Sequence, residues 1–290
     1  IGYYNPYFTD SGISRGIDLF YSDIDASKAN LVDYTLNSYG SSMNFVLPIS
    51  EYNTVFTEVE YSHTDITLLS RASQELRDFL SSNGNNFDML TLSTAISFDT
   101  RDRAYFPESG VFHQIYGEIS VPVFTDVLNF YKITYKTEWV NRLWLNWILS
   151  LRAQFAYGDG YGNTDDLPFF ENFYAGGPRS VRGFRQNTLG PDDSNGSAFG
   201  GNKKVVGNAE IFFPIPFLEL QQLRFSTFVD GGNVFGPDEV FDFDMLRYSA
   251  GAGIVWISPL GIIRLSYAKP LVTEPGDHVQ ELQFSFGASF

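Results

Sequence analysis

Residues 173–184 read Phe-Tyr-Ala-Gly-Gly-Pro-Arg-Ser-Val-Arg-Gly-Phe and set two arginines among glycines and aromatic residues. The stretch lies within residues 158–201, the longest interruption of a chain that otherwise alternates polar and apolar side chains. A loop of this length is usually functional or disordered. Gly176 and Gly177 would let its backbone fold tightly against a neighbour. The prediction of function therefore depends on what Arg182 contacts.

On both sides of this stretch the alternation has a period of two residues. In residues 204–213, for example, Val205 and Ile211 oppose Asn208 and Glu210. A period of two is typical of strands, since helices repeat every 3.6 residues. The same pattern covers residues 13–23, 38–47, 52–64, 89–99, 111–123, 131–139, 147–157, 223–230, 248–256, 262–268 and 279–290. We predict one all-β domain over residues 1–290, an antiparallel up-and-down β-barrel of about twelve strands joined mostly by short turns. A turn or two of helix is expected within residues 74–80.

The composition fits a barrel that spans a membrane. The mean hydropathy is -0.12, and no apolar run approaches the roughly 20 residues of a transmembrane helix. A transmembrane barrel has such values because only alternate residues face lipid. The 28 Phe and 17 Tyr of this chain gather toward the ends of the predicted strands, as the aromatic girdles of transmembrane barrels require. A soluble β-sandwich is the alternative, but strands of regular length along nearly the whole chain favour the membrane barrel.

Charge and side-chain chemistry exclude several function classes. A net charge of -15 argues against a nucleic-acid partner held by phosphate contacts, and the absence of cysteine excludes thiol chemistry. His63, His113 and His278 lie on separate segments without a serine nucleophile motif, which argues against an enzyme. Asp192 and Asp193 with Asn195 lack the regular oxygen-ligand spacing of a calcium loop. We therefore expect neither a metal nor a cofactor.

The alternation also predicts partners for Arg182. An arginine inside a barrel is costly unless carboxylates accept its donors. Glu210 and Asp230 lie on the polar faces of their strands, so both point inward if the apolar faces meet lipid. Two inward carboxylates could clamp Arg182 with paired hydrogen bonds. The alternative, a solvated Arg182 above a wet channel, stays open on spacing alone.

Several motifs resemble the BamA family of outer-membrane protein assembly factors. The most specific is the tetrad Val181-Arg182-Gly183-Phe184 in its Phe-Tyr-Ala-Gly-Gly context. Residues 102–107, 167–172 and 256–261 and the closing Phe286-Gly287 also match. Secretion transporters and patatin-linked barrels share the tetrad, but the Pro-Phe-Phe-Glu-Asn segment before it resembles the BamA family most closely.

The resemblance implies a multi-pass barrel of the bacterial outer membrane that inserts other proteins. Residues 158–201 would be an extracellular loop folded into the lumen, carrying Arg182 to Glu210 and Asp230. The implied partners are the lipid bilayer, nascent outer-membrane β-barrel clients and accessory lipoproteins. A polypeptide-secretion transporter or passive pore is the alternative, in which Arg182 would tune passage.

The resemblance also implies a weak seam at the last strand. Residues 282–290 alternate apolar and polar side chains and end on Phe290, like the terminal recognition strand of outer-membrane proteins. In the family, the last strand meets the first at a seam that opens to pair with a client strand. Phe284, Phe286, Gly287 and Phe290 would carry the seam here, with Gly287 at the position of the family's kink.

The strand count departs from the family pattern. The family barrel has sixteen strands after periplasmic POTRA modules, whereas this chain has about twelve and no POTRA sequence. We expect an excised or truncated piece, starting at Ile1, that lacks the first strands and half of the seam. Either residues 13–23 pair with the last strand in a narrower ring, or the sheet stays open.

Overall fold

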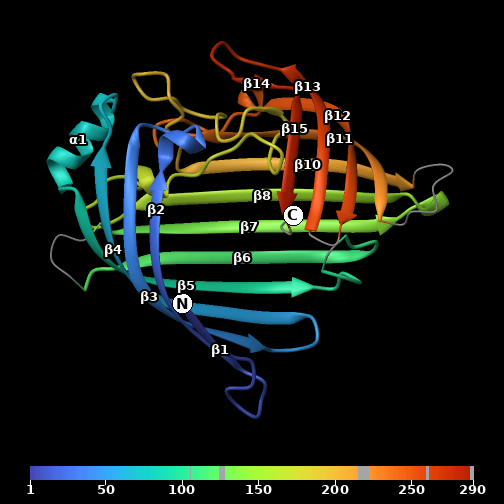
Figure 1. Ribbon diagram of the computed structural model, residues 1–290, viewed down its shortest axis with the longest axis horizontal. Coiled ribbons are helices and arrows are strands. Elements are labelled where there is room, and N and C mark those ends of the chain that lie inside the picture. The colour runs from blue at the N-terminus through green and yellow to red at the C-terminus, as the bar shows by residue number, and fades with distance from the viewer. Residues whose placement is uncertain (105, 124–127, 215–221, 259–260, 288–290) are drawn as a thin grey trace.

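Thirteen strands form one antiparallel sheet in the computed structural model, which describes residues 1–290 except 105, 124–127, 215–221, 259–260 and 288–290. Strands that follow each other along the chain lie side by side around one curled wall (Figure 1). The sheet strands are β1 (Gly2–Asn5), β2 (Ser14–Asp25), β3 (Tyr34–Pro48), β4 (Asn53–Leu68), β5 (Asn86–Asp99), β6 (Gly110–Val121), β7 (Phe130–Arg142), β8 (Ile148–Gly160), β10 (Lys203–Pro214), β11 (Leu223–Phe235), β12 (Arg247–Ser258), β13 (Gly261–Val272) and β15 (Leu282–Gly287).

The remaining elements lie in the connections. Two-residue strands β9 (Gly183–Phe184) and β14 (Val279–Gln280) pair with each other outside the main sheet. Within the described residues, the one α-helix is α1 (Gln74–Asn83), and short 3-10 turns are η1 (Ala26–Ala29), η2 (Trp144–Asn146), η3 (Phe169–Glu171) and η4 (Phe243–Met245). Among the described residues, no helix has the length and apolar character needed to cross a membrane.

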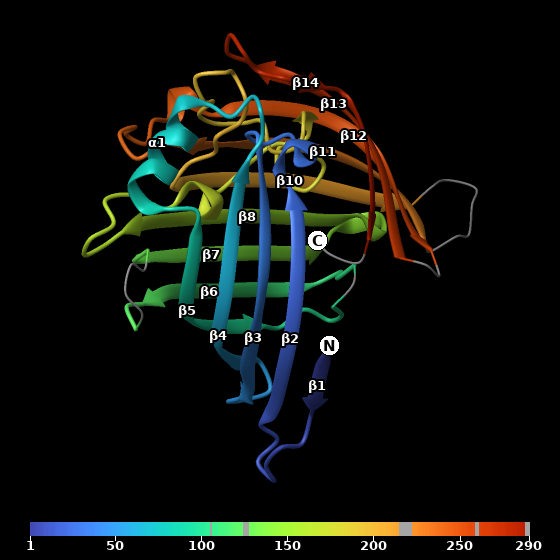
Figure 2. The same cartoon turned by 60° about the vertical axis from the view of Figure 1, so that its left-hand side comes forward.

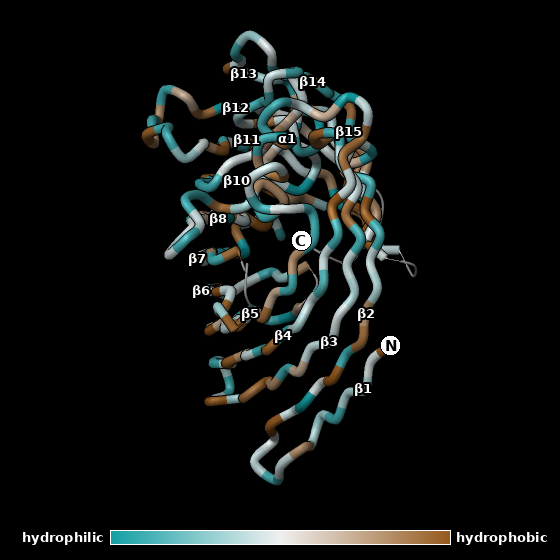
Figure 3. The backbone as a smooth tube through the Cα atoms, turned by 90° about the vertical axis from the view of Figure 1, so that its left-hand side faces the viewer, coloured by the Kyte–Doolittle hydropathy of each residue, from teal (hydrophilic) through white to brown (hydrophobic). Residues whose placement is uncertain are grey.

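Polar and apolar residues alternate along the strands, as Figure 3 shows by hydropathy. Ile115 and Ile133, on apolar strand faces, are 56% and 50% exposed on the outside of the wall. Glu210 and Asp230, on the opposite faces, are buried. The period-two pattern therefore separates an apolar outer surface from a polar interior.

The predicted all-β fold and its antiparallel meander are confirmed. Each of the twelve predicted strand segments contributes to the sheet, and β1 adds a further strand by pairing with residues 15–18 of β2. Residues 1–8, with Asn5-Pro6 at a turn, indicate the tail of a strand, and β1 is that strand. The helix expected within residues 74–80 is α1, which extends to Asn83.

The prediction of one terminal strand over residues 279–290 is wrong. The chain there is divided into β14 and β15, and β14 leaves the sheet to pair with β9. Ala268 N donates to Glu281 O at 2.9 Å, and the next residue of β13 facing the same edge is Pro270. Proline has no N–H to donate, so the ladder cannot continue normally past this point.

Of the two options for the last strand, pairing with residues 13–23 is not found among the described residues, because β2 pairs with β1 and β3. Across the described residues, the ladders run from β1 to β15, and β15 has β13 as its one strand partner. Figure 2 shows β1 beside β2, and β15 is the last strand at the other end of the order. Among the described residues, no ladder joins β15 to the strands at the other end of the order.

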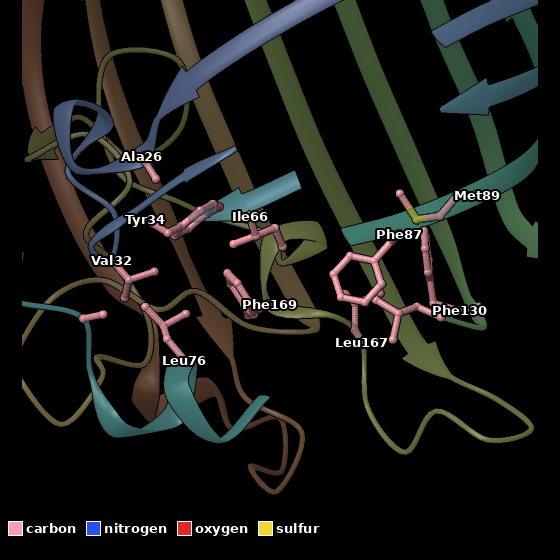
Figure 4. Close-up of a cluster of buried hydrophobic side chains, with 12 residues drawn as sticks. Ala26, Val32, Tyr34, Ile66, Leu76, Phe87, Met89, Phe130, Leu167 and Phe169 are labelled. Atoms are coloured by element: carbon pink, nitrogen blue, oxygen red, sulfur yellow. The ribbon is translucent and has the colours of Figure 1, made fainter. Parts of the chain in front are cut away.

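An apolar cluster lies between α1, the first strands and the connection from β8 to β10 (Figure 4). Phe169 from that connection meets Tyr34 of β3 and Phe79 of α1 edge-to-face, with ring centroids 5.0 Å apart in both pairs. We call this the α1 cluster, and its buried members are Ala26, Val32, Tyr34, Ile66, Ala72, Leu76, Phe87, Met89, Leu128, Phe130, Leu167 and Phe169.

Candidate functional site

Residues 161–202, hereafter the long loop, connect β8 to β10 and pack against both halves of the curled sheet. Phe169 reaches the first strands through the α1 cluster. Val181 and Phe184 pack with Val206 of β10 and Val234 of β11 in a second buried apolar cluster. The loop interior is thus fixed to the wall at two separate places.

Two glycines make the turn that presents the tetrad. Gly176 and Gly177 have φ values of 95° and 94°, a region that side chains other than glycine rarely adopt. A Cβ built on Gly176 would lie 2.5 Å from the carbonyl oxygen of Arg185. Gly177 N donates to Phe184 O at 3.0 Å and closes the turn. This tight turn leaves Arg182 directed toward the wall.

Arg182 is 1% exposed and lies between the two carboxylates named from the sequence. Its Nε and Nη2 donate to Asp230 Oδ2 and Oδ1 at 2.7 and 2.8 Å, and its backbone N donates to Oδ2 at 3.0 Å. Its Nη1 donates to Glu210 Oε1 at 3.0 Å. The guanidinium carbon lies 3.3 Å from the ring centroid of Phe228. Arg182 is therefore held on its edges by carboxylates and on one face by an aromatic ring.

Three further residues complete the group, and sequence reasoning did not select them. Arg264 Nη1 donates to Glu210 Oε2 at 2.9 Å, and Arg152 Nη2 does so at 3.4 Å. Asn208 Nδ2 donates to Asp230 Oδ1 at 2.8 Å. Each lies on the polar face of its strand, so strand parity is the signal that could have identified them. We call Arg152, Arg182, Asn208, Glu210, Asp230 and Arg264 the charge cluster.

The charge cluster determines the position of the loop more than it adds stability. A buried ion pair gains little over apolar packing because both charges lose water, but removal of one partner leaves an uncompensated buried charge. Glu210 and Asp230 are 1% and 0% exposed. Without Arg182, Asp230 would retain Asn208 as a neutral donor. The tetrad therefore has one energetically preferred location on the wall.

The tetrad also contacts the segment before the last strand. Phe184 and Gly183 pair with Val279 and Gln280. Arg185 N donates to His278 O at 2.7 Å, and Gln283 Nε2 donates to Phe184 O at 2.6 Å. These contacts join the loop that carries Arg182 to the top of β15.

The ladder between β13 and β15 defines which backbone groups face the open edge. Ala268 and Glu281 form a hydrogen-bonded pair, and such pairs alternate with non-bonded pairs along an antiparallel ladder. The odd-numbered residues of β15 therefore direct their N–H and C=O groups toward β13. The even-numbered residues direct theirs toward the edge that has no strand partner among the described residues.

Three of the four predicted seam residues lie on this strand. Phe284 and Phe286 are even-numbered and are 63% and 52% exposed, so their side chains point outward while their backbone groups face the edge. Gly287 has a φ of 141°, and a Cβ built there would lie 3.1 Å from Arg179 Nη2. Phe290 lies outside the described residues.

The segment with Asp192, Asp193 and Asn195 shapes the loop. Asp193 is buried, and its Oδ1 accepts hydrogen bonds from Asn195 N at 2.9 Å and Ser197 N at 2.8 Å. Over the described part of the chain, no group of three or more His, Asp or Glu residues is arranged to hold a metal ion. His63 and His113 bond to Asp88 and Tyr135, separate from the charge cluster.

Comparison with known proteins gives the family. BamA of Neisseria meningitidis, an outer membrane protein assembly factor, is 30% identical over the whole of this chain, which covers 41% of that protein. BamA of Nitratidesulfovibrio vulgaris is 26% identical over 99% of this chain, which covers 35% of that protein. The chain thus spans well under half of these two relatives.

The fold agrees with a solved relative. The crystal structure of BamA from Haemophilus ducreyi lacking POTRA domains 1-3 matches 98% of this chain and 60% of that chain, with a TM-score of 0.85 and 25% identity. The family model described as the Omp85 superfamily domain matches residues 1–290. The chain therefore belongs to the Omp85 superfamily.

Proposed function

We propose that this chain assists the folding and insertion of β-barrel proteins in the bacterial outer membrane, and that β15 is the strand on which a client first pairs. The observation that carries the proposal is the open edge of β15, where even-numbered backbone groups have no strand partner among the described residues. An exposed strand edge is a template for another strand. The assembly-factor names of the relatives support the same reading.

The bilayer supplies the driving force for client pairing. Backbone groups without partners cost several kcal/mol each in lipid, and the outward side chains of Phe284 and Phe286 would hold this edge at lipid depth. An incoming client strand has the same unsatisfied groups. Pairing of the two edges satisfies both sets, and hydrogen bonds alone account for the step, without a cofactor or a covalent reaction.

The charge cluster is proposed to brace the wall while the seam exchanges partners. The long loop would lie at the outer surface with its tetrad inside the barrel. Proposed partners are the lipid bilayer, nascent outer-membrane β-barrel clients and, through segments beyond this domain, accessory lipoproteins of an assembly complex.

A proline at the open edge tests the proposal. Phe284→Pro removes one edge-facing N–H and leaves the bonds to β13 in place, and edge strands tolerate such a proline. Phe284→Ala removes the same side chain and retains the N–H. With the intact natural protein in liposomes, we expect Phe284→Pro to slow client folding at least about tenfold, since 1.4 kcal/mol is a factor of ten, while Phe284→Ala keeps most of the activity.

Client folding is measured by protease protection and heat-modifiable electrophoretic mobility, and the same assay on the variant itself shows that it has folded. Equal rates for the two variants would refute the edge mechanism. A passive pore or secretion transporter is the competing function. Arg182→Ala with unchanged client folding and altered ion conductance would favour that function.

A further inference from the structure

A cavity of about 690 Å³ opens at the α1 end of the sheet, away from the charge cluster. Its walls come from η1 and the residues after it, the segment that leads into α1, and the part of the long loop after the tetrad. Three arginines line it, Arg71, Arg77 and Arg185, together with polar side chains such as Asn30 and Thr188. These arginines come from distant parts of the sequence and meet only through the fold.

The three arginines are not neutralised. Within the described residues, none of them makes an ion pair, and Asp33 is the one carboxylate in the lining. Most other arginines of the chain are paired with carboxylates: Arg101, Arg103, Arg142, Arg152, Arg182, Arg224, Arg247 and Arg264. Three arginines against one carboxylate is an unusual lining in a chain of net charge -15.

The backbone around the cavity is fixed in place. Asn195 Nδ2 donates to Arg71 O at 2.8 Å, and Ser194 Oγ donates to the Glu75 carboxylate at 2.8 Å. These bonds tie the long loop to the segment that carries Arg71 and Arg77. Arg185 is held by its backbone bond to His278. The guanidinium groups remain available while their attachment points are ordered, which lowers the entropic cost of binding a ligand.

We propose that this cavity is a binding site for a phosphate-bearing anion. Guanidinium forks match phosphate oxygens with paired, charge-assisted hydrogen bonds. The volume lies in the range of small-molecule sites. The ligand is either a soluble phosphate ester or the phosphorylated headgroup of a membrane glycolipid. This site goes beyond the proposed assembly function and does not depend on it.

Binding experiments with two probes separate the two sources. The folded chain in a neutral detergent is titrated with inorganic pyrophosphate by calorimetry, and the chain in neutral-lipid nanodiscs is tested with lipid A against its dephosphorylated form. Pyrophosphate binding assigns a soluble ester, and selective binding of lipid A without pyrophosphate binding assigns a headgroup. If neither probe binds, the proposal is overturned.

Matched arginine variants test the location of the site. Arg77→Gln removes one charge from the cavity, and Arg15→Gln removes an equal charge from the opposite end of β2, where Arg15 stacks on Phe8. We expect Arg77→Gln to raise the Kd several-fold, and the triple change of Arg71, Arg77 and Arg185 to Gln to raise it at least about tenfold. Arg15→Gln should leave the Kd unchanged. If Arg15→Gln and Arg77→Gln raised the Kd equally, the anion would be attracted by diffuse positive charge and not bound in this cavity, and the proposed site would be overturned.

Discussion

The two anchors of the long loop differ in chemistry. Near its start, Phe169 is buried among aromatic and aliphatic side chains of the α1 cluster. Near its middle, Arg182 is buried against two carboxylates and Asn208 lies beside them. Both residues are nearly inaccessible, at 3% and 1% exposure.

The α1 cluster holds the loop against the wall, whereas the charge cluster determines its exact position. Apolar burial is non-directional and scales with area, so the α1 cluster can adjust to a shifted ring. The charge cluster uses paired donors with defined geometry, so it specifies one register. The tetrad, which the charge cluster positions, pairs with β14 and accepts a hydrogen bond from Gln283 of β15. We infer that the charge cluster, rather than the α1 cluster, controls the last strand.

Removal of the ionic anchor should have the largest effect. Arg182→Ala leaves Asp230 and part of Glu210 as uncompensated buried charge, and we expect a loss of about 3–5 kcal/mol in the free energy of unfolding. Urea unfolding in lipid vesicles, followed by tryptophan fluorescence, measures it. Arg182→Lys keeps the positive charge but lacks the paired guanidinium donors. Its free energy of unfolding should lie between that of the unchanged protein and that of Arg182→Ala. A loss below about 1 kcal/mol for Arg182→Ala would show that the carboxylates are solvated.

Truncation of the apolar anchor should cost somewhat less. Phe169→Ala creates a cavity in the α1 cluster, and we expect a loss of about 3 kcal/mol in the same unfolding assay. Phe169→Leu refills much of the space and should recover more than half of the loss. If Phe169→Leu were as damaging as Phe169→Ala, the aromatic geometry rather than burial would hold this part of the loop.

The link between the tetrad and the last strand should contribute the smallest free energy. Gln283→Ala removes the donor to Phe184 O, and we expect a loss of about 1 kcal/mol. Gln280→Ala alters an exposed side chain on the same segment and serves as the control. Equal stability of the Gln283 variant and the control would mean that the 2.6 Å bond contributes little.

Strand parity predicted much of the charge cluster. It assigned Glu210 and Asp230 to the interior because their neighbours are apolar, and the same rule covers Arg152, Asn208 and Arg264. Parity states which face a residue occupies but not which interior residues converge. Convergence depends on register, which places Asp230 opposite Asn208 on the adjacent strand. A single sequence does not specify register where the turn lengths vary.

Other features had no periodic signal. Phe169 belongs to a loop, so its contact with Tyr34 could not be inferred from alternation. The break between β14 and β15 follows from Pro270 on β13, which has no N–H for the ladder. The position of Pro270 opposite residue 279 is known only from the register between β13 and β15. Long-range pairing, rather than local pattern, determined both features.

Residue-resolved amide hydrogen exchange on β15 tests most directly whether the charge cluster controls the last strand. The amides of Gln283 and Ser285, which face β13, are compared with that of Tyr135 in β7 as an internal reference for global unfolding. We expect Arg182→Ala to lower protection at β15 relative to β7 at least about tenfold, and Phe169→Ala to leave the ratio unchanged. An equal change of the ratio in both variants would contradict control of the last strand by the charge cluster.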